Sequence, residues 1–377
     1  MIGRVACFSY VTRNLKMIHK VILFLSTSLA SLALAGPATS TTPICSKSDS
    51  SGIISWRSSK STCHGPSEVY TVRPSPGKGL GVFALHDLEV GAIVMRETPI
   101  LTIKRPDFIK GTGYPMSAVS RLVRAEFALL SREQQEEVMN LTYHATEVEE
   151  ESSDRLGLIF RSNAYNTGED IGLFPKIARI NHSCRPNTGY YWNAKLNKRI
   201  VYANRQIKKG EELFDSYIPL LLTREDRQKR LGPYGFTCSC EACALENGAM
   251  RQSDKRRVDI RTTLMEFEPQ LALTMPDDAS AKRKAVENVK ASLRLVELVQ
   301  LEGLADYYAN AYRIAAIGHA RVQEWGPATK WAKKAYELRV MVDPESPHAM
   351  EMYVLTSKFI ENWKSELREK SLLRDEV

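Results

Sequence analysis

The chain carries little excess charge, and this limits what its composition can support. Its 377 residues include 52 lysine and arginine residues and 44 aspartate and glutamate residues, giving a formal net charge of +8. The first 35 residues hold four of the basic residues and no acidic one, so the remainder has 48 basic and 44 acidic residues, or +4. So mild an excess gives no argument for a nucleic-acid site.

An apolar segment of the usual length for a membrane span is also lacking. The run at residues 21–35 has 15 residues, fewer than the roughly 20 that a spanning helix needs. It follows His19-Lys20 and ends in Ala33-Leu34-Ala35, a small-residue pattern typical of signal-peptide cleavage sites. We therefore predict a signal-peptide-like segment at residues 1–35, with Met17 as an alternative start; a short membrane anchor and a misassigned first exon are the alternatives.

Cysteine is scarce, with seven residues in the whole chain. Signal cleavage would remove Cys7. Cys45 and Cys63 flank a Ser/Thr-rich stretch, and we interpret residues 36–66 as a linker. These two thiols either pair in an oxidising compartment or are unrelated thiols in that linker.

The remaining cysteines predict a metal site. Three lie within six residues in a C-x-C-x-x-C pattern, and the nearest upstream cysteine lies in Asn181-His182-Ser183-Cys184. Zinc takes four thiolate or imidazole ligands in a tetrahedron, so we predict a structural zinc site. Disulfides are the alternative, but the close C-x-C spacing favours metal. The predicted ligands are Cys184, Cys238, Cys240 and Cys243.

Three ordered segments carry a family resemblance: the N-H-S-C-x-P-N motif at residues 181–187, G-E-E-L-x-x-S-Y at residues 210–217, and F-x-C-x-C-x-x-C at residues 236–243. This string resembles SET-domain protein lysine methyltransferases. The pattern is SMYD-like and of fungal type, and in SMYD-like proteins the cysteine of N-H-S-C binds one zinc ion together with the three later cysteines. The resemblance implies S-adenosylmethionine-dependent methyl transfer to a protein or peptide lysine, in a histone or another protein.

Site residues follow from this resemblance position by position. It implies that Tyr217 is catalytic, orienting the lysine amine and helping to remove its proton. Taken alone, the G-x-G pattern near residue 77 usually marks a tight turn, and Asn163 alone is better explained as a core-edge asparagine hydrogen-bonded to a turn. The positions that the family uses for the methyl donor are Gly77, Lys78, Gly79, Leu80, Asn163, Asn181, His182, Tyr217 and Phe236.

The compartment stays open at this stage. The signal-like segment indicates the secretory pathway, with nucleus or cytoplasm as the alternative. Asn181-His182-Ser183 is itself an N-x-S sequon, as is Asn140-Leu141-Thr142. A glycan on Asn181 would be incompatible with the donor pocket that the resemblance implies.

One family module is missing. Between Cys63 and Cys184 the sequence contains no cysteine, so the MYND zinc finger that SMYD proteins insert in this region is absent. In its place, helical periodicity from Met116 to Leu130 and a capping box at residues 131–134 predict a helical insertion at about residues 104–157. The acidic run at residues 147–151 is interpreted as a solvated loop.

The C-terminal third is predicted to be helical throughout. Residues 305–322 and 328–341 read as a helix pair broken at Gly326-Pro327, with small residues at Ala328, Ala332 and Ala335 allowing close packing. One such unit resembles a tetratricopeptide repeat, with a generic helical bundle as the alternative.

We thus predict an α+β protein: a SET β-fold at residues 67–236 split by the helical insertion, a zinc-stapled post-SET segment at 237–250, and an all-helical, TPR-like domain at 251–377. The predicted function is protein-lysine N-methylation, by an enzyme that we expect to be monomeric and to have no nucleic-acid site. The alternative function is a non-catalytic, zinc-stabilised interaction module, and a secreted effector is a further one.

Overall fold

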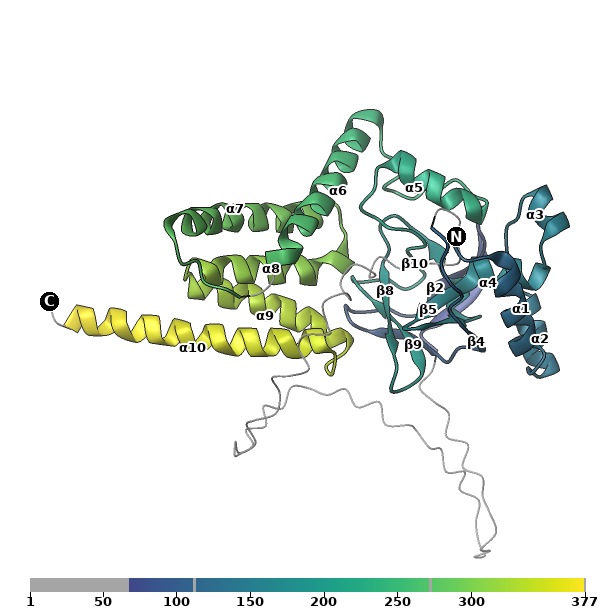
Figure 1. The fold of residues 1–377 in the computed structure, drawn as a ribbon, viewed down its shortest axis with the longest axis horizontal. Helices are drawn as coiled ribbons and strands as arrows, with labels where there is room; N and C mark the ends of the chain where they lie inside the picture. Colours follow the sequence, from purple (N-terminus) through teal and green to yellow (C-terminus); the bar gives the residue numbers. More distant parts are fainter. Residues whose placement is uncertain (1–67, 111–112, 271–272, 376–377) are drawn as a thin grey trace, which may run out of the picture.

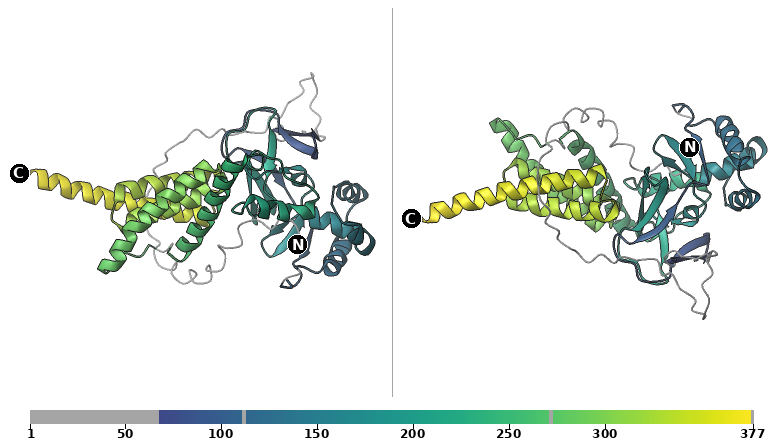
Figure 2. Two further views of the ribbon diagram at one scale, coloured as in Figure 1. Left: turned by 90° about the horizontal axis from the view of Figure 1, so that it is seen from above. Right: turned by 90° about the horizontal axis from the view of Figure 1, so that it is seen from below.

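The computed structural model describes residues 68–110, 113–270 and 273–375, and the chain forms three regions in a row (Figure 1). A helical insertion lies at one end, strands β1–β10 form the middle, and helices α6–α10 form the other end; the views of Figure 2 agree with this order. The signal-like segment, the linker and Cys7, Cys45 and Cys63 lie outside the described residues. The predicted α+β class is confirmed.

A four-stranded sheet brings the sequence motifs together. Its strands are ordered β1-β2-β10-β7, and β1 and β2 form an antiparallel hairpin whose turn includes Gly77 at φ +70°. Strand β10 pairs in parallel with β7, opposing Phe214 to Asn181 and Asp215 to His182. This pairing sets the N-H-S-C segment beside the G-E-E-L segment. The bounds are β1 Tyr70–Ser75, β2 Gly79–Ala84, β7 Asn181–His182 and β10 Glu212–Asp215.

Two three-stranded sheets complete the middle region, in the orders β3-β9-β8 and β4-β6-β5. Arg199 is buried here, and its guanidinium lies over the rings of Tyr165 and Tyr190 at 4.2 and 4.4 Å. Aromatic faces attract cations, so these rings stabilise the buried charge. The strands are β3 Ile93–Glu97, β4 Leu101–Lys104, β5 Ala164–Thr167, β6 Asp170–Leu173, β8 Thr188–Asn193 and β9 Lys198–Ala203.

The insertion comprises α1 (Met116–Phe127), α2 (Arg132–Met139), α3 (Glu147–Ser152) and α4 (Arg155–Asn163), so helix continues past residue 157. The predicted capping box at the start of α2 is confirmed. The interpretation of residues 147–151 as a loop is wrong, because they form α3. Thr146 and Glu149 make a second capping box there, and acidic side chains in a first turn are stabilised by the helix dipole.

The cysteine segment follows α5 (Arg224–Leu231), and beyond it the chain is mainly helical: α6 Asn247–Phe267, α7 Ala279–Leu301, α8 Tyr308–Arg321, α9 Trp325–Val342 and α10 Pro347–Asp375. Short 3-10 turns occur at Ile177–Arg179, Gly232–Tyr234, Glu268–Gln270 and Ala305–Tyr307. Across the described residues, no helix combines the length and apolar character that a membrane crossing requires.

The helix pair of the sequence prediction exists, but its break is displaced. Helix α9 begins at Trp325, so Gly326-Pro327 lies inside its first turn, and the chain turns at residues 322–324 instead. Proline is tolerated in a first turn because the amide it lacks has no partner within the helix there. Three alanines of α9 are fully buried, as the close-packing prediction requires: Ala328, Ala332 and Ala335.

Candidate active site and metal centre

The three motifs converge on one cavity of about 660 Å³. Its wall is built from the β1–β2 turn, the end of α4, strand β7, the segment after β10 and the cysteine segment. Gly79 is not part of the lining, although it lies beside residues that are. The other predicted donor-site residues all line the cavity: Gly77, Lys78, Leu80, Asn163, Asn181, His182, Tyr217 and Phe236.

Tyr217 is held at two points in this wall. Its hydroxyl donates to the Ile180 carbonyl oxygen at 2.7 Å, and its backbone N–H donates to His182 Nδ1 at 3.1 Å. The ring lies among other aromatic rings, with centroid distances of 5.1 Å to Tyr234 and 6.3 Å to Phe236. The phenol donates its one proton to Ile180 O, and its oxygen can also act as a hydrogen-bond acceptor.

His182 connects this aromatic cluster to the cysteines. Its Nδ1 accepts from the Tyr217 backbone, so that nitrogen carries no proton and we assign the proton to Nε2. Nε2 lies 3.4 Å from Cys184 Sγ, where an N–H can donate to sulfur. A single buried imidazole thus joins the proposed catalytic segment to the cysteine cluster.

The two asparagines of the predicted donor site are both fixed by hydrogen bonds. Asn163 donates from Nδ2 to the Thr142 and Ile159 carbonyl oxygens, at 2.8 and 2.9 Å. Asn163 lines the cavity, and it also ties the loop that follows α2 to the end of α4. Asn181 donates from Nδ2 to Leu80 O and to Glu212 Oε1, and a glycan on that nitrogen would disrupt these bonds.

The four predicted metal ligands form a cluster. Their sulfur atoms all lie within 4.8 Å of one another, and Cys184 Sγ is 3.6 Å from Cys243 Sγ. A tetrahedron with zinc–sulfur bonds of about 2.3 Å would place its sulfurs about 3.8 Å apart, so the arrangement fits this ion. Gln228 steadies the cluster, accepting from the Cys238 backbone N–H and donating to the Cys238 carbonyl.

The four thiols differ in how readily they lose a proton. Hydrogen bonds with Cys184 and Cys238 lower the pKa of Cys243 to about 7, and the same two neighbours lower the pKa of Cys240. Hydrogen bonds with the other three thiols raise the pKa of Cys184, and, although Cys184 opposes it, Cys240 and Cys243 raise the pKa of Cys238. Metals bind thiolates rather than thiols, so two of the four sulfurs are already biased toward the form that binds.

The helical region supports the loop that carries Cys184. Arg257 is fully buried and donates to the Cys184 carbonyl oxygen at 3.1 Å and to the Leu220 carbonyl oxygen at 2.8 Å. Its Nε also donates to Glu302, which is fully buried at the end of α7. The Arg257 guanidinium on α6 thus anchors two segments of the site, the loop at Cys184 and the segment at Leu220 that follows Tyr217.

Several lining residues escaped the sequence prediction. Tyr234 stands two residues before Phe236, and an aromatic pair at that spacing could have indicated it. Thr142, Tyr143 and His144 belong to the insertion and carry no motif, so nothing local indicated that they reach the cavity. Glu211 of G-E-E-L also lines the cavity and had no predicted role; neither had Glu212, which is not part of the lining.

We expect Gly235→Ala to destabilise the cavity wall. Gly235 has φ +77°, and a Cβ there would lie 2.4 Å from His144 Cγ and Nδ1. Left-handed backbone costs an L residue about 1–2 kcal/mol, and His144 would also be displaced. Thermal unfolding should show a lower Tm than for Gly232→Ala, the control three residues earlier, which has nothing within 4 Å. Equal melting of the two variants would contradict this packing.

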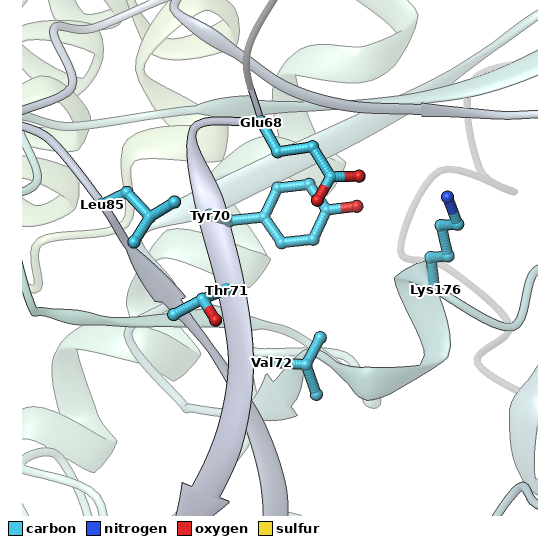
Figure 3. Close-up of a pocket in the computed structure, with 6 residues that line it drawn as sticks. All are labelled: Glu68, Tyr70, Thr71, Val72, Leu85 and Lys176. Carbon is cyan, nitrogen blue, oxygen red and sulfur yellow. The ribbon is translucent and has the colours of Figure 1, made fainter.

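A second hollow of about 540 Å³ lies beside edge strand β1 (Figure 3). It contains none of the predicted site residues. Burial, then Glu68 and Glu97, raise the pKa of Tyr70 to about 12, so its phenol stays neutral near pH 7. The lining of the hollow is Glu68, Tyr70, Thr71, Val72, Leu85 and Lys176.

Comparison with known proteins agrees with this geometry. Residues 79–218 match the SET domain family. Histone-lysine N-methyltransferase set5 of Schizosaccharomyces pombe is 28% identical over 310 residues, 79% of this chain and 85% of that protein. Human N-lysine methyltransferase SMYD2 is 31% identical over 192 residues, 47% of this chain and 41% of its own length. A proposed histone methyltransferase of Plasmodium falciparum aligns with 18% identity over 41% of this chain and 96% of its own, at a TM-score of 0.23.

A strand-paired N-H-S-C segment, a tyrosine beside it and a cysteine cluster at the same cavity make up the candidate active site. Residues 79–218 carry a SET domain, and the chain is related to the lysine methyltransferases set5 and SMYD2. It spans about two fifths of the length of the SMYD2 relatives.

Proposed function

We propose that the protein transfers a methyl group from S-adenosylmethionine to a lysine side chain of a protein substrate. The observation that carries this proposal is the shared cavity, in which Tyr217, Asn181, His182 and the β1–β2 turn meet. SET methyltransferases use S-adenosylmethionine, which supplies an electrophilic sulfonium methyl group when bound. Gly77, Asn181 and His182 would hold the donor, and its methyl group would pass to the neutral lysine nitrogen while S-adenosylhomocysteine leaves. The lysine ammonium would first give up a proton to solvent.

The chain's own residues would prepare the lysine for this step. A lysine amine must be neutral to attack, yet its ordinary pKa is about 10.4. Entry between Tyr217, Tyr234 and Phe236 would remove water and so lower that pKa. The ring faces tolerate the cation before it loses its proton. The Tyr217 oxygen, fixed by its bond to Ile180 O, is placed to accept an N–H from the amine and so to orient it.

Radiolabelled donor tests the proposal. Purified protein is incubated with it and with an array of histone and non-histone peptides, and each spot is repeated with lysine replaced by arginine. We expect label on lysine peptides only. The set5 relative is a histone-lysine enzyme by name and SMYD2 an N-lysine enzyme, so both classes belong on the array. Donor binding without transfer to any peptide or protein would favour the non-catalytic alternative.

We further propose one structural zinc ion on Cys184, Cys238, Cys240 and Cys243. Four thiolates leave no open coordination position, so the ion would hold the N-H-S-C loop against the later segment and take no part in methyl transfer.

Elemental analysis is expected to find one zinc per chain, and Cys184→Ser is expected to lose it because three ligands bind zinc less tightly than four. The variant should also melt at a lower temperature, since the loop loses its attachment. Ser239→Ala, between two of the proposed ligands, serves as the control and should retain zinc. Stoichiometric zinc in Cys184→Ser would exclude Cys184 as a ligand.

A further inference from the structure

The carboxylate of Glu212 is a junction between three strands. Oε1 accepts from Asn181 Nδ2 at 2.8 Å, and Oε2 accepts from Ser75 Oγ at 2.9 Å and from Lys78 Nζ at 3.1 Å. The Glu212 side chain is only 11% exposed. Glu212 begins β10, while its partners lie at the end of β1, in the β1–β2 turn and in β7. One carboxylate therefore joins β10 to β1, to the β1–β2 turn and to β7.

Its first effect is on the orientation of Asn181. The Asn181 amide gives one hydrogen to Leu80 O and the other to Glu212 Oε1. A flipped amide would set its oxygen against two acceptors, so the observed orientation is the favourable one. Oδ1 is then the group that Asn181 has left for a ligand, and it can only accept. Glu212 thus decides which end of a cavity-lining amide a ligand meets.

Its second effect is on Lys78. The ammonium is paired with Glu212 and lies 4.4 Å from the centroid of the Phe214 ring. Lys78 sits in the turn between β1 and β2, whose Gly77 and Gly79 both have positive φ. A turn rich in glycine has many alternative conformations, and this anchor restricts them. Glu212 thereby fixes the conformation of a turn that lines the cavity.

Gly81 makes the junction possible. A Cβ on this residue would lie 2.5 Å from Glu212 Oε1 and 3.0 Å from Asn181 Nδ2. Any larger residue would push the carboxylate and the amide apart. The approach of the two side chains therefore depends on the absence of a side chain at residue 81.

We infer that Glu212 is a positioning residue for binding of the methyl donor. It acts through Asn181, whose acceptor it presents to the cavity, and through Lys78, whose turn it anchors. It takes no part in the transfer step itself. This inference rests on the proposed function, because it concerns the donor that the proposed reaction uses.

Glu212→Gln tests it at constant size. All three partners of the carboxylate present hydrogens, so the NH₂ group of glutamine must face one of them. We expect the Kd for S-adenosylhomocysteine, measured by titration calorimetry, and the KM for the donor to rise about tenfold. The kcat at saturating donor should stay within about twofold. Glu225→Gln, a 78% exposed glutamate on α5, is the control and should match the wild type.

A double-mutant cycle with Lys78→Met provides a second readout. Since Glu212 is proposed to act partly through Lys78, the Lys78 substitution should weaken donor binding in the wild type but add little in Glu212→Gln. The cycle also applies if Glu212→Gln is partly destabilised, since it compares binding within one background. Fully additive losses would show that Lys78 acts independently of Glu212.

The outcomes separate this inference from the proposed function. A wild-type protein that binds no donor overturns the proposed function. A wild type that binds, with an unchanged Glu212→Gln, overturns only the inference. Parallel losses of kcat, affinity and Tm in Glu212→Gln would mean a purely structural role and would overturn it as well.

Discussion

Replacing Tyr217 with phenylalanine is expected to slow methyl transfer at least about a hundredfold, the scale lost with a well-placed positioning group. The substitution removes only the hydroxyl, which donates to Ile180 O at 2.7 Å. The amine would then lose the fixed acceptor that orients it. The ring contacts with Tyr234 and His182 remain, and donor binding should persist.

Single-turnover rates with labelled donor measure the effect, with donor affinity measured in parallel by calorimetry. Tyr353→Phe is the matched control, because that tyrosine is 53% exposed on α10, away from the cavity. It should retain the wild-type rate. Full activity in Tyr217→Phe would remove Tyr217 from the mechanism and leave the cavity's role in donor binding intact.

Glu302→Ala is expected to cost about 3–5 kcal/mol of unfolding free energy, the range found when one partner of a buried ion pair is removed. Glu302 is fully buried and accepts from Arg256 at 2.6 Å, from Arg257 at 3.0 Å and from Ser253 at 2.7 Å. Burial opposes ionisation, but these hydrogen bonds and charges together lower its pKa. Without it, the Arg257 charge would be left buried near the cysteine cluster.

Urea unfolding monitored by circular dichroism measures this loss. Glu287→Ala on the same helix is the control, since Glu287 and its partner Lys284 are 70% and 66% exposed. Exposed pairs contribute little, so the control should change stability by less than about 1 kcal/mol. Similar losses in the two variants would show that the buried cluster does not support the fold.

Local sequence predicted the parts of the site that depend on local spacing. C-x-C-x-x-C fixes three thiols on one short segment, and N-H-S-C and G-E-E-L are contiguous motifs. The capping box at Ser131 was readable for the same reason, since its two bonds lie within one helical turn. The small residues of α9 predicted its buried face because they recur near the helical period.

The remainder depends on contacts between distant segments. Nothing near Glu302 in the sequence indicates that it meets Arg257 on another helix, and nothing near His144 indicates that it faces Gly235. Glu212 belongs to the recognisable G-E-E-L motif, but its role depends on contacts with Ser75 and Asn181, which lie on separate strands. The loop prediction at residues 147–151 failed because a charge run was weighed above the Thr146 cap that precedes it.

The dependence of the Cys184 loop on α6 and α7 has a consequence for the order of events on the ribosome. Chains tend to fold from the N-terminus as they are made, domain by domain. Here β1, β2 and β7 emerge early, but the guanidinium that supports Cys184 comes with α6, and the carboxylate that neutralises it comes only at the end of α7. A nascent chain that stops short of Glu302 therefore lacks the full support of the Cys184 loop, and we expect its cavity to be less well formed. Full methyl transfer would begin only after most of the polypeptide has left the exit tunnel, so truncated translation products would be less active.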